Sequence, residues 1–228
     1  MANIHMIGVH HADPNGDRKL DKTLKRIKPD LILVEGSQAT EETDKIFRAT
    51  LLQGLAASGL SREMQQALLY DRGDGYEWKR IKTYARQYRA RFDYLNDETQ
   101  HAIAFQPVDA EEIRMKAIEE LAYLLDPEHV GKIHELNASL ARINELVDCL
   151  HRTFTNTPRE HELAGHMPKP DARDATMEAT LRQHISQNTR ARIATVTGYA
   201  HITSRPTRDS FYDRVVDLKP ERIFQFVG

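Results

Sequence analysis

The chain has 228 residues, 40% of them hydrophobic and 29% charged, which suits one α/β domain of residues 1–228 with a single hydrophobic core. Its 32 basic and 34 acidic residues are interspersed and give a formal net charge of -2, so no net positive field recruits nucleic acid or an anionic membrane. One cysteine, Cys149, excludes an internal disulfide framework and fits a reducing compartment. No signal peptide and no apolar run of ~20 residues is visible, so we expect a cytoplasmic protein without a membrane span.

The first part of the chain predicts a strand, a helix and a second strand. Residues 4–9 are a brief apolar run followed by a turn, residues 18–27 have apolar side chains at helical spacing, and residues 31–34 are continuously apolar. A continuous apolar run is typical of a strand buried on both faces. The three elements therefore predict a right-handed parallel unit, with Glu35 at the carboxyl end of its second strand.

The middle of the chain is predicted to be mainly helical. Helical spacing extends over residues 40–70, with a break at Ser58-Gly59, and over residues 76–94. Residues 101–108 predict a third strand. The basic and aromatic residues of 76–94 spread around the helix, which favours a solvated face over a nucleic-acid surface.

Two further helices, at residues 110–125 and 128–154, predict an antiparallel hairpin that breaks at Asp126-Pro127. With the loop after it, the hairpin forms an insertion over residues 110–170, acting as a lid or as a dimerisation element. Its long apolar faces favour a homodimer, since such faces are often shared between subunits.

The last part predicts a helix at residues 171–187, a strand that ends at Gly198, a short strand at 215–216 and a final strand at 223–227. We expect the final strand to be antiparallel at the edge of the sheet. The predicted fold class is thus α/β, with a mixed, mainly parallel central sheet flanked by helices and a helical hairpin insertion.

Two predicted strands end in the same Gly-x-x-His pattern, Gly8 to His11 and Gly198 to His201. Glycine allows a sharp turn, and a histidine three residues later can lie at the carboxyl edge of a sheet, where open α/β folds bind ligands. Glu35 falls at the same edge. We therefore expect distant parts of the chain to meet in one site.

His11, Glu35 and His201 carry the donor types that a divalent metal ion requires, with room for a water whose pKa the ion lowers to about 7. The same residue types also support a reaction without metal. In that case a histidine is the general base, a carboxylate orients it and an arginine stabilises negative charge. The sequence leaves both mechanisms open.

Structural interpretations compete with these roles. His11 and His201 can each be hydrogen-bonded within a turn, and Glu35 can cap the helix that begins near Ser37. His10 points away from His11 if the strand continues, which makes it either a supporting donor or a core residue.

Two further candidates, Tyr199 and Glu77, each have a functional and a structural interpretation. Tyr199 either positions an oxyanion and covers the site or packs in the core. Glu77 either joins the site from the start of its helix or interacts with the helix dipole.

The ordered motifs resemble the TraB/Tiki family, within a wider superfamily that includes erythromycin esterases and ChaN-type proteins. The resemblance rests on the two Gly-x-x-His motifs and on the glutamate of Leu33-Val34-Glu35-Gly36. Residues 171–177 also look like the family's Arg-Asp/Asn and Met helix, and Gly75-Tyr76-Glu77 resembles its Gly-x-Glu helix start. The first motif departs from the family, because His10 stands where a hydroxyl-bearing residue is frequent.

The resemblance implies a metal-dependent peptidase-like or other hydrolase activity, as in some members, while others act in peptide control or haem binding. It implies that Arg173 stabilises an oxyanion and that a divalent metal ion is a cofactor. We therefore predict hydrolysis of peptide, amide or ester bonds in a peptide or small-molecule substrate. The alternative is a noncatalytic protein that holds a peptide, haem or small ligand. The candidate catalytic residues are His11, Glu35, Arg173 and His201. The candidate metal ligands are His11, Glu35 and His201, and the candidate binding residues are Gly8, His10, Glu77, Gly198 and Tyr199.

Overall fold

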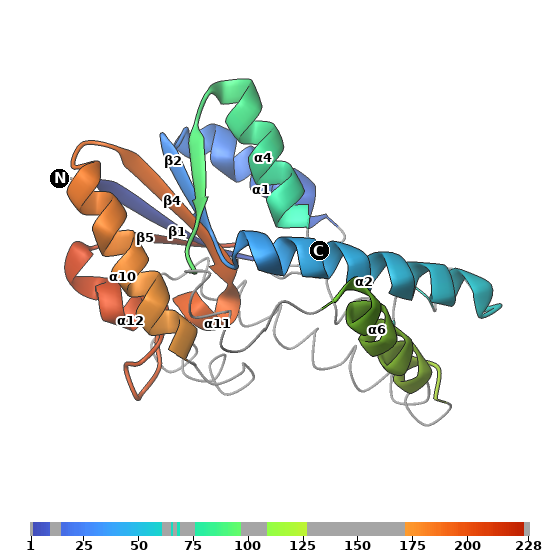
Figure 1. Cartoon of the computed structure of the whole chain (residues 1–228). Helices are drawn as coiled ribbons and strands as arrows, with labels where there is room; N and C mark the ends of the chain where they lie inside the picture. The colour runs from blue at the N-terminus through green and yellow to red at the C-terminus, as the bar shows by residue number, and fades with distance from the viewer. Residues whose placement is uncertain are drawn as a thin grey trace.

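The computed structural model describes residues 2–9, 15–60, 65, 68, 76–96, 109–126 and 172–225, and it shows a central sheet with helices on both faces (Figure 1). Its strands are β1 (Asn3–Val9), β2 (Leu31–Val34), β3 (Arg91–Tyr94), β4 (Arg192–Gly198) and β5 (Glu221–Phe224). They lie in the order β3-β2-β4-β1-β5, and each neighbouring pair is parallel. The predicted α/β class, with its parallel central sheet flanked by helices, is confirmed.

Helices of different parts of the chain cover the two faces of the sheet. One face carries α10 (Ala172–Gln187), α11 (Tyr199–Ile202) and α12 (Phe211–Val215), which runs into a 3-10 turn, η1 (Val216–Leu218). The other face carries α1 (Gly16–Ile27) and α4 (Tyr76–Tyr88). Each face therefore has its own apolar core.

The alternation of side chains along β2 determines where the next residue points. Leu31 and Leu33 pack in the core beneath α10, whereas Ile32 and Val34 pack in the core beneath α1 and α4. Because successive side chains of a strand point to opposite faces, the position after Val34 falls on the α10 side. That position is Glu35.

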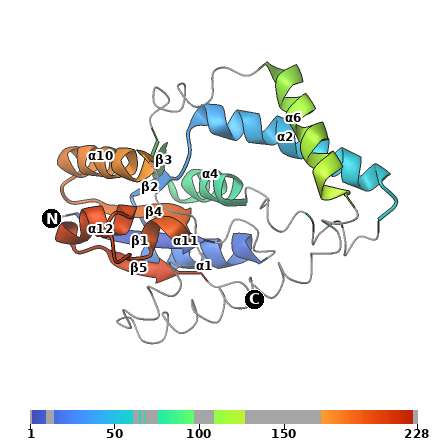
Figure 2. The ribbon, with the colours of Figure 1, turned by 90° about the horizontal axis from the view of Figure 1, so that it is seen from below.

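A third apolar cluster lies away from the sheet, between α2 (Gln38–Ala57) and α6 (Ala110–Leu124), which cross side by side (Figure 2). The approach is close, since a Cβ on Gly54 would lie 2.1 Å from Cδ2 of Leu121. α6 matches the predicted first helix of the hairpin. The second helix and the loop, residues 128–170, lie outside the described residues.

The structure corrects the prediction that residues 91–94 continue a helix. α4 ends at Tyr88, Arg89 adopts a left-handed φ of 56°, and the chain then enters β3 beside β2. The backbone N–H of Arg91 donates to the carbonyl of Asp30 at 3.0 Å, which begins this pairing. The predicted strand at 101–108 lies outside the described residues.

The tail also differs from its prediction. Residues 215–216 are helical, because Ser210 and Asp213 form a reciprocal capping box that starts α12. β5 is parallel to β1, since α11 and α12 return the chain across one face of the sheet before it re-enters at the edge. Among the described helices, none combines the length and apolar character needed to cross a bilayer.

Candidate functional site

Four of the predicted site residues meet at the carboxyl edge of the sheet: Glu35, Arg173, Gly198 and His201. β2 and β4 are hydrogen-bonded neighbours, so the residues that come after them lie at the same edge. Glu35 follows β2, and α11 begins directly after β4 and carries His201. Nε2 of His201 lies 3.1 Å from Oε1 of Glu35.

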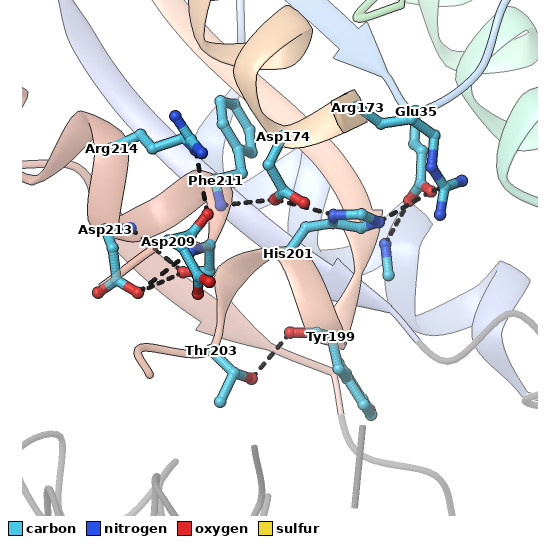
Figure 3. A network of polar contacts seen from close by, with 12 residues as sticks. Glu35, Arg173, Asp174, Tyr199, His201, Thr203, Asp209, Phe211, Asp213 and Arg214 are labelled. Carbon is cyan, nitrogen blue, oxygen red and sulfur yellow. Dashed lines mark hydrogen bonds and ion pairs between the residues drawn. The ribbon is translucent and has the colours of Figure 1, made fainter. Parts of the chain in front are cut away.

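The other ring nitrogen of His201 is held by Asp174, in the first turn of α10 (Figure 3). Nδ1 of His201 lies 3.0 Å from Oδ1 of Asp174, whose side chain is fully buried. The same oxygen accepts from the backbone N–H of Phe211 at 2.6 Å. The imidazole is therefore fixed between two carboxylates.

Glu35 has partners on three elements. Its Oε2 accepts from the backbone N–H of Gly198 at 2.8 Å, and its Oε1 lies 3.3 Å from Nη1 of Arg173. The Glu35 side chain is 14% exposed and that of Arg173 is 45% exposed, so the cluster reaches solvent on the arginine side. We call Glu35, Arg173, Asp174, His201 and the Gly198 N–H the Glu35–His201 site.

The charges in this site alternate in sign. Burial alone would lower the pKa of His201, but the negative charges of Glu35 and Asp174 and their hydrogen bonds outweigh it and raise the pKa to about 10. The imidazole is therefore a cation at neutral pH, with both ring nitrogens donating. An Asp⁻, His⁺, Glu⁻, Arg⁺ series results, in which His201 is a proton donor.

Three of the predicted binding residues lie at the ends of β1 and β4. Gly198 contributes its N–H to Glu35. Gly8 lies under α11, where a Cβ would come within 2.4 Å of Cδ1 of Ile202. Tyr199 is buried in the core against Phe224, and its ring points away from His201 (Figure 3).

Glu77 is buried in the first turn of α4. The next residue, Trp78, donates from Nε1 to the backbone carbonyl of Glu35 at 3.2 Å, so the start of α4 lies beside the loop after β2. His10 and His11 follow Val9, which pairs with Gly198, but both histidines lie outside the described residues.

The donors that converge can be compared with the needs of a metal ion. Nε2 of His201 and Oε1 of Glu35 face each other, and a carboxylate on the opposite ring nitrogen is the usual support of a metal-binding histidine. Within the described ranges, no three His, Cys, Asp or Glu side chains are arranged as a metal site. The two donors therefore fit a divalent ion only together with a further ligand, the role predicted for His11.

The chain matches no family model, no curated protein and no solved structure. Asp174 belongs to the Glu35–His201 site but was not among the predicted site residues. Its position next to Arg173, in the Arg-Asp pair at the start of a helix, is the signal that could have identified it.

Proposed function

We propose that the chain is a hydrolase of peptide, amide or ester bonds, related to the TraB/Tiki family, whose reaction takes place at the Glu35–His201 site. The observation that carries the proposal is the 3.1 Å contact between Nε2 of His201 and Oε1 of Glu35, with the imidazole fixed from behind by a buried carboxylate. An acid and a base within hydrogen-bond distance of each other, one of them oriented by a third group, are a common arrangement in acyl-group hydrolysis.

The alternating charges assign a role to each side chain. The ionised Glu35 accepts a proton from a water that attacks the substrate carbonyl, and the exposed guanidinium of Arg173 stabilises the oxyanion that forms. His201, as imidazolium, donates its Nε2 proton to the leaving amine or alkoxide as the bond to carbon breaks. Transfer of the proton from Glu35 to His201 across their 3.1 Å contact then restores the starting state.

A metal-dependent form of the same site uses the donors already described. His201, after losing its Nε2 proton, would hold a divalent ion together with Glu35 and His11, and such an ion would lower the pKa of a bound water to about 7. Asp174 would then keep the imidazole oriented through Nδ1.

The noncatalytic alternative draws on the same charges. Arg173 and His201 are cations on either side of the Glu35 carboxylate, an arrangement that also suits binding of a peptide, haem or small ligand with charged groups. Saturable binding without turnover would favour this alternative.

The test compares turnover of the full-length protein, stripped of metal and then reloaded with Zn²⁺, Mn²⁺ or Mg²⁺, on p-nitrophenyl esters, amino-acid p-nitroanilides and fluorogenic peptides. We expect His201→Gln and Glu35→Gln each to lower kcat/KM by at least about 100-fold. The matched control is His184→Gln, because His184 also pairs with a carboxylate, Asp93, but lies outside the site.

Unchanged turnover in His201→Gln would refute the proposed mechanism, and the absence of turnover on every substrate would refute the hydrolase assignment. His11→Gln separates the two forms of the mechanism. Loss of both metal content and activity in that variant supports the metal-dependent form, and full activity in metal-free wild-type protein supports the direct one.

A further inference from the structure

The loop after β2 turns sharply at Gly36, one residue beyond Glu35. Gly36 has a φ of 103°, a left-handed conformation that favours glycine, and a Cβ there would lie 3.2 Å from the ring of Trp78. The direction of the Glu35 side chain depends on how this turn is held, since the backbone at residues 35 and 36 sets the direction of the Cα–Cβ bond.

Asn96 holds the turn at two points. Its side-chain Oδ1 accepts from the backbone N–H of Gly36 at 2.8 Å, and its own N–H donates to the carbonyl of Gly36 at 3.3 Å. The Asn96 side chain is buried. It reaches Gly36 because Leu95 continues the pairing beyond β3, donating to the carbonyl of Val34 at 2.8 Å.

The peptide groups on both sides of Glu35 are fixed in the same way. The N–H of Glu35 donates to the carbonyl of Val196 at 2.9 Å, and its carbonyl accepts from Nε1 of Trp78 at 3.2 Å. With the contacts to Gly36, four backbone groups in succession have defined partners. These hydrogen bonds therefore fix the backbone that carries the Glu35 side chain.

We propose that Asn96 is a positioning residue that aims the Glu35 carboxylate at His201 and at the N–H of Gly198. Its effect on turnover rests on the proposed function, whereas its effect on the geometry of Glu35 does not. The contacts of Glu35 are short and directional, at 2.8 Å to Gly198 and 3.1 Å to His201, so a displacement of about 1 Å removes them.

The Gly198 amide reports this geometry without a substrate, because it donates directly to Oε2 of Glu35. The chain has 11 glycines, so selective ¹⁵N-glycine labelling gives a spectrum simple enough to follow amide exchange at Gly198 and Gly36. Glu35→Ala defines the exchange rate of Gly198 when the carboxylate is absent.

We expect Asn96→Ala to increase exchange at Gly198 by about tenfold or more, toward the rate in Glu35→Ala. Asn96→Asp is expected to restore the wild-type rate, because an aspartate oxygen can still accept from the Gly36 N–H. The control is Tyr84→Phe, which removes a buried hydrogen bond of 3.1 Å to the Leu24 carbonyl on the opposite face of the sheet. We expect Tyr84→Phe to lower the free energy of unfolding. Exchange at Gly198 should then rise by no more than the increase in global unfolding explains.

A purely structural role predicts faster exchange at Gly36 alone, with Gly198 unchanged, and that result overturns the proposal. If the alanine variant does not fold, Asn96→Ser replaces it, because serine keeps a shorter acceptor. An unchanged, wild-type exchange rate at Gly198 in Asn96→Ser would also overturn the proposal. Where turnover is found, we expect Asn96→Ala to lower kcat with little change in KM, and Asn96→Asp to recover it. Because exchange needs no turnover, it tests the positioning role even if the hydrolase assignment fails.

Discussion

One oxygen of Asp174 contacts both His201, at 3.0 Å from Nδ1, and Phe211, at 2.6 Å from the backbone nitrogen. Asp174 lies on α10, His201 on α11 and Phe211 at the start of α12. A single buried carboxylate therefore joins the three helices on this face of the sheet. The same carboxylate therefore orients the candidate catalytic imidazole and helps to hold these helices together.

Replacing Asp174 by asparagine tests this arrangement. Asparagine keeps an oxygen that can accept from Phe211 but removes one of the two negative charges beside His201. We expect the pKa of His201 to fall from about 10 and to remain above 6.5, because Glu35 is still present. NMR titration of the His201 ring protons in metal-free protein measures the change. Asp209→Asn is the control, since Asp209 is a half-buried carboxylate that accepts from the Thr207 hydroxyl and has no contact with His201 in the described part of the chain. An equal shift in both variants contradicts the prediction.

The raised pKa of His201 also predicts how stability depends on pH. Its folded-state pKa of about 10 lies above the ordinary value of 6.5, so the folded state binds a proton that the unfolded state loses between these values. The stabilisation is complete below pH 6.5 and is lost as the pH rises to about 10. We expect this loss to be on the order of 3–5 kcal/mol in the free energy of unfolding.

Urea unfolding of wild type and His201→Gln at a series of pH values measures this loss. Glutamine does not titrate. The difference in unfolding free energy between the two proteins should therefore shrink from pH 6.5 to about pH 10, where His201 has lost its proton in the unfolded state but keeps it in the folded state. Parallel stability curves would show that His201 does not gain its proton affinity from folding.

Gly8 and Ile202 provide a test of packing beneath the site. A Cβ at position 8 would lie 2.4 Å from Cδ1 of the buried Ile202, so Gly8→Ala overpacks the contact between β1 and α11. We expect a loss of about 1–3 kcal/mol in the free energy of unfolding. Ile202→Val removes the clashing methyl, and the double variant should recover part of the loss in a thermal or urea unfolding cycle. Strictly additive effects would argue against a direct clash.

The sequence predicted the meeting of Glu35 and His201 because two simple rules locate both residues. Short, continuously apolar runs identify the strands before them, and neighbouring parallel strands place the residues after their carboxyl ends at a common edge. The role of Asp174 could not be predicted in the same way. Its partners, a ring nitrogen on α11 and a backbone N–H on α12, come from elements whose path across the sheet is set by tertiary packing.

β3 illustrates a second limit of sequence-based prediction. Its residues Arg91, Phe92 and Asp93 are exposed at the edge of the sheet, so the strand has neither a continuous apolar run nor a buried alternating face. It also comes only two residues after an amphipathic helix. The change of structure depends on the left-handed backbone at Arg89 and on pairing with β2, neither of which gives a sequence pattern.

The ion cluster that attaches α2 beside β3 gives the last prediction. Glu41, buried in the first turn of α2, accepts from Nζ of Lys82 at 2.7 and 2.6 Å and from the Tyr94 hydroxyl at 2.6 Å, and Nζ of Lys45 lies 2.9 Å away. Burial alone would raise the pKa of Glu41, but these hydrogen bonds outweigh it and lower the pKa to about 2. Glu41 therefore stabilises the fold above pH 4.5, and this contribution is lost as the pH falls toward 2.

Glu41→Gln should therefore lower the free energy of unfolding by about 2–4 kcal/mol at neutral pH, because it leaves Lys82 without its buried anionic partner. Glu42→Gln, which makes the same charge change at the next, exposed position, should change stability by less than about 0.5 kcal/mol. Urea unfolding at pH 7 and pH 3 measures how much of this loss depends on the ionised carboxylate. The difference in unfolding free energy between wild type and Glu41→Gln should be smaller at pH 3, where Glu41 in the wild type has lost part of its stabilising effect. A deficit of equal size at both pH values would mean that the ionised carboxylate is not what holds α2 against α4 and β3.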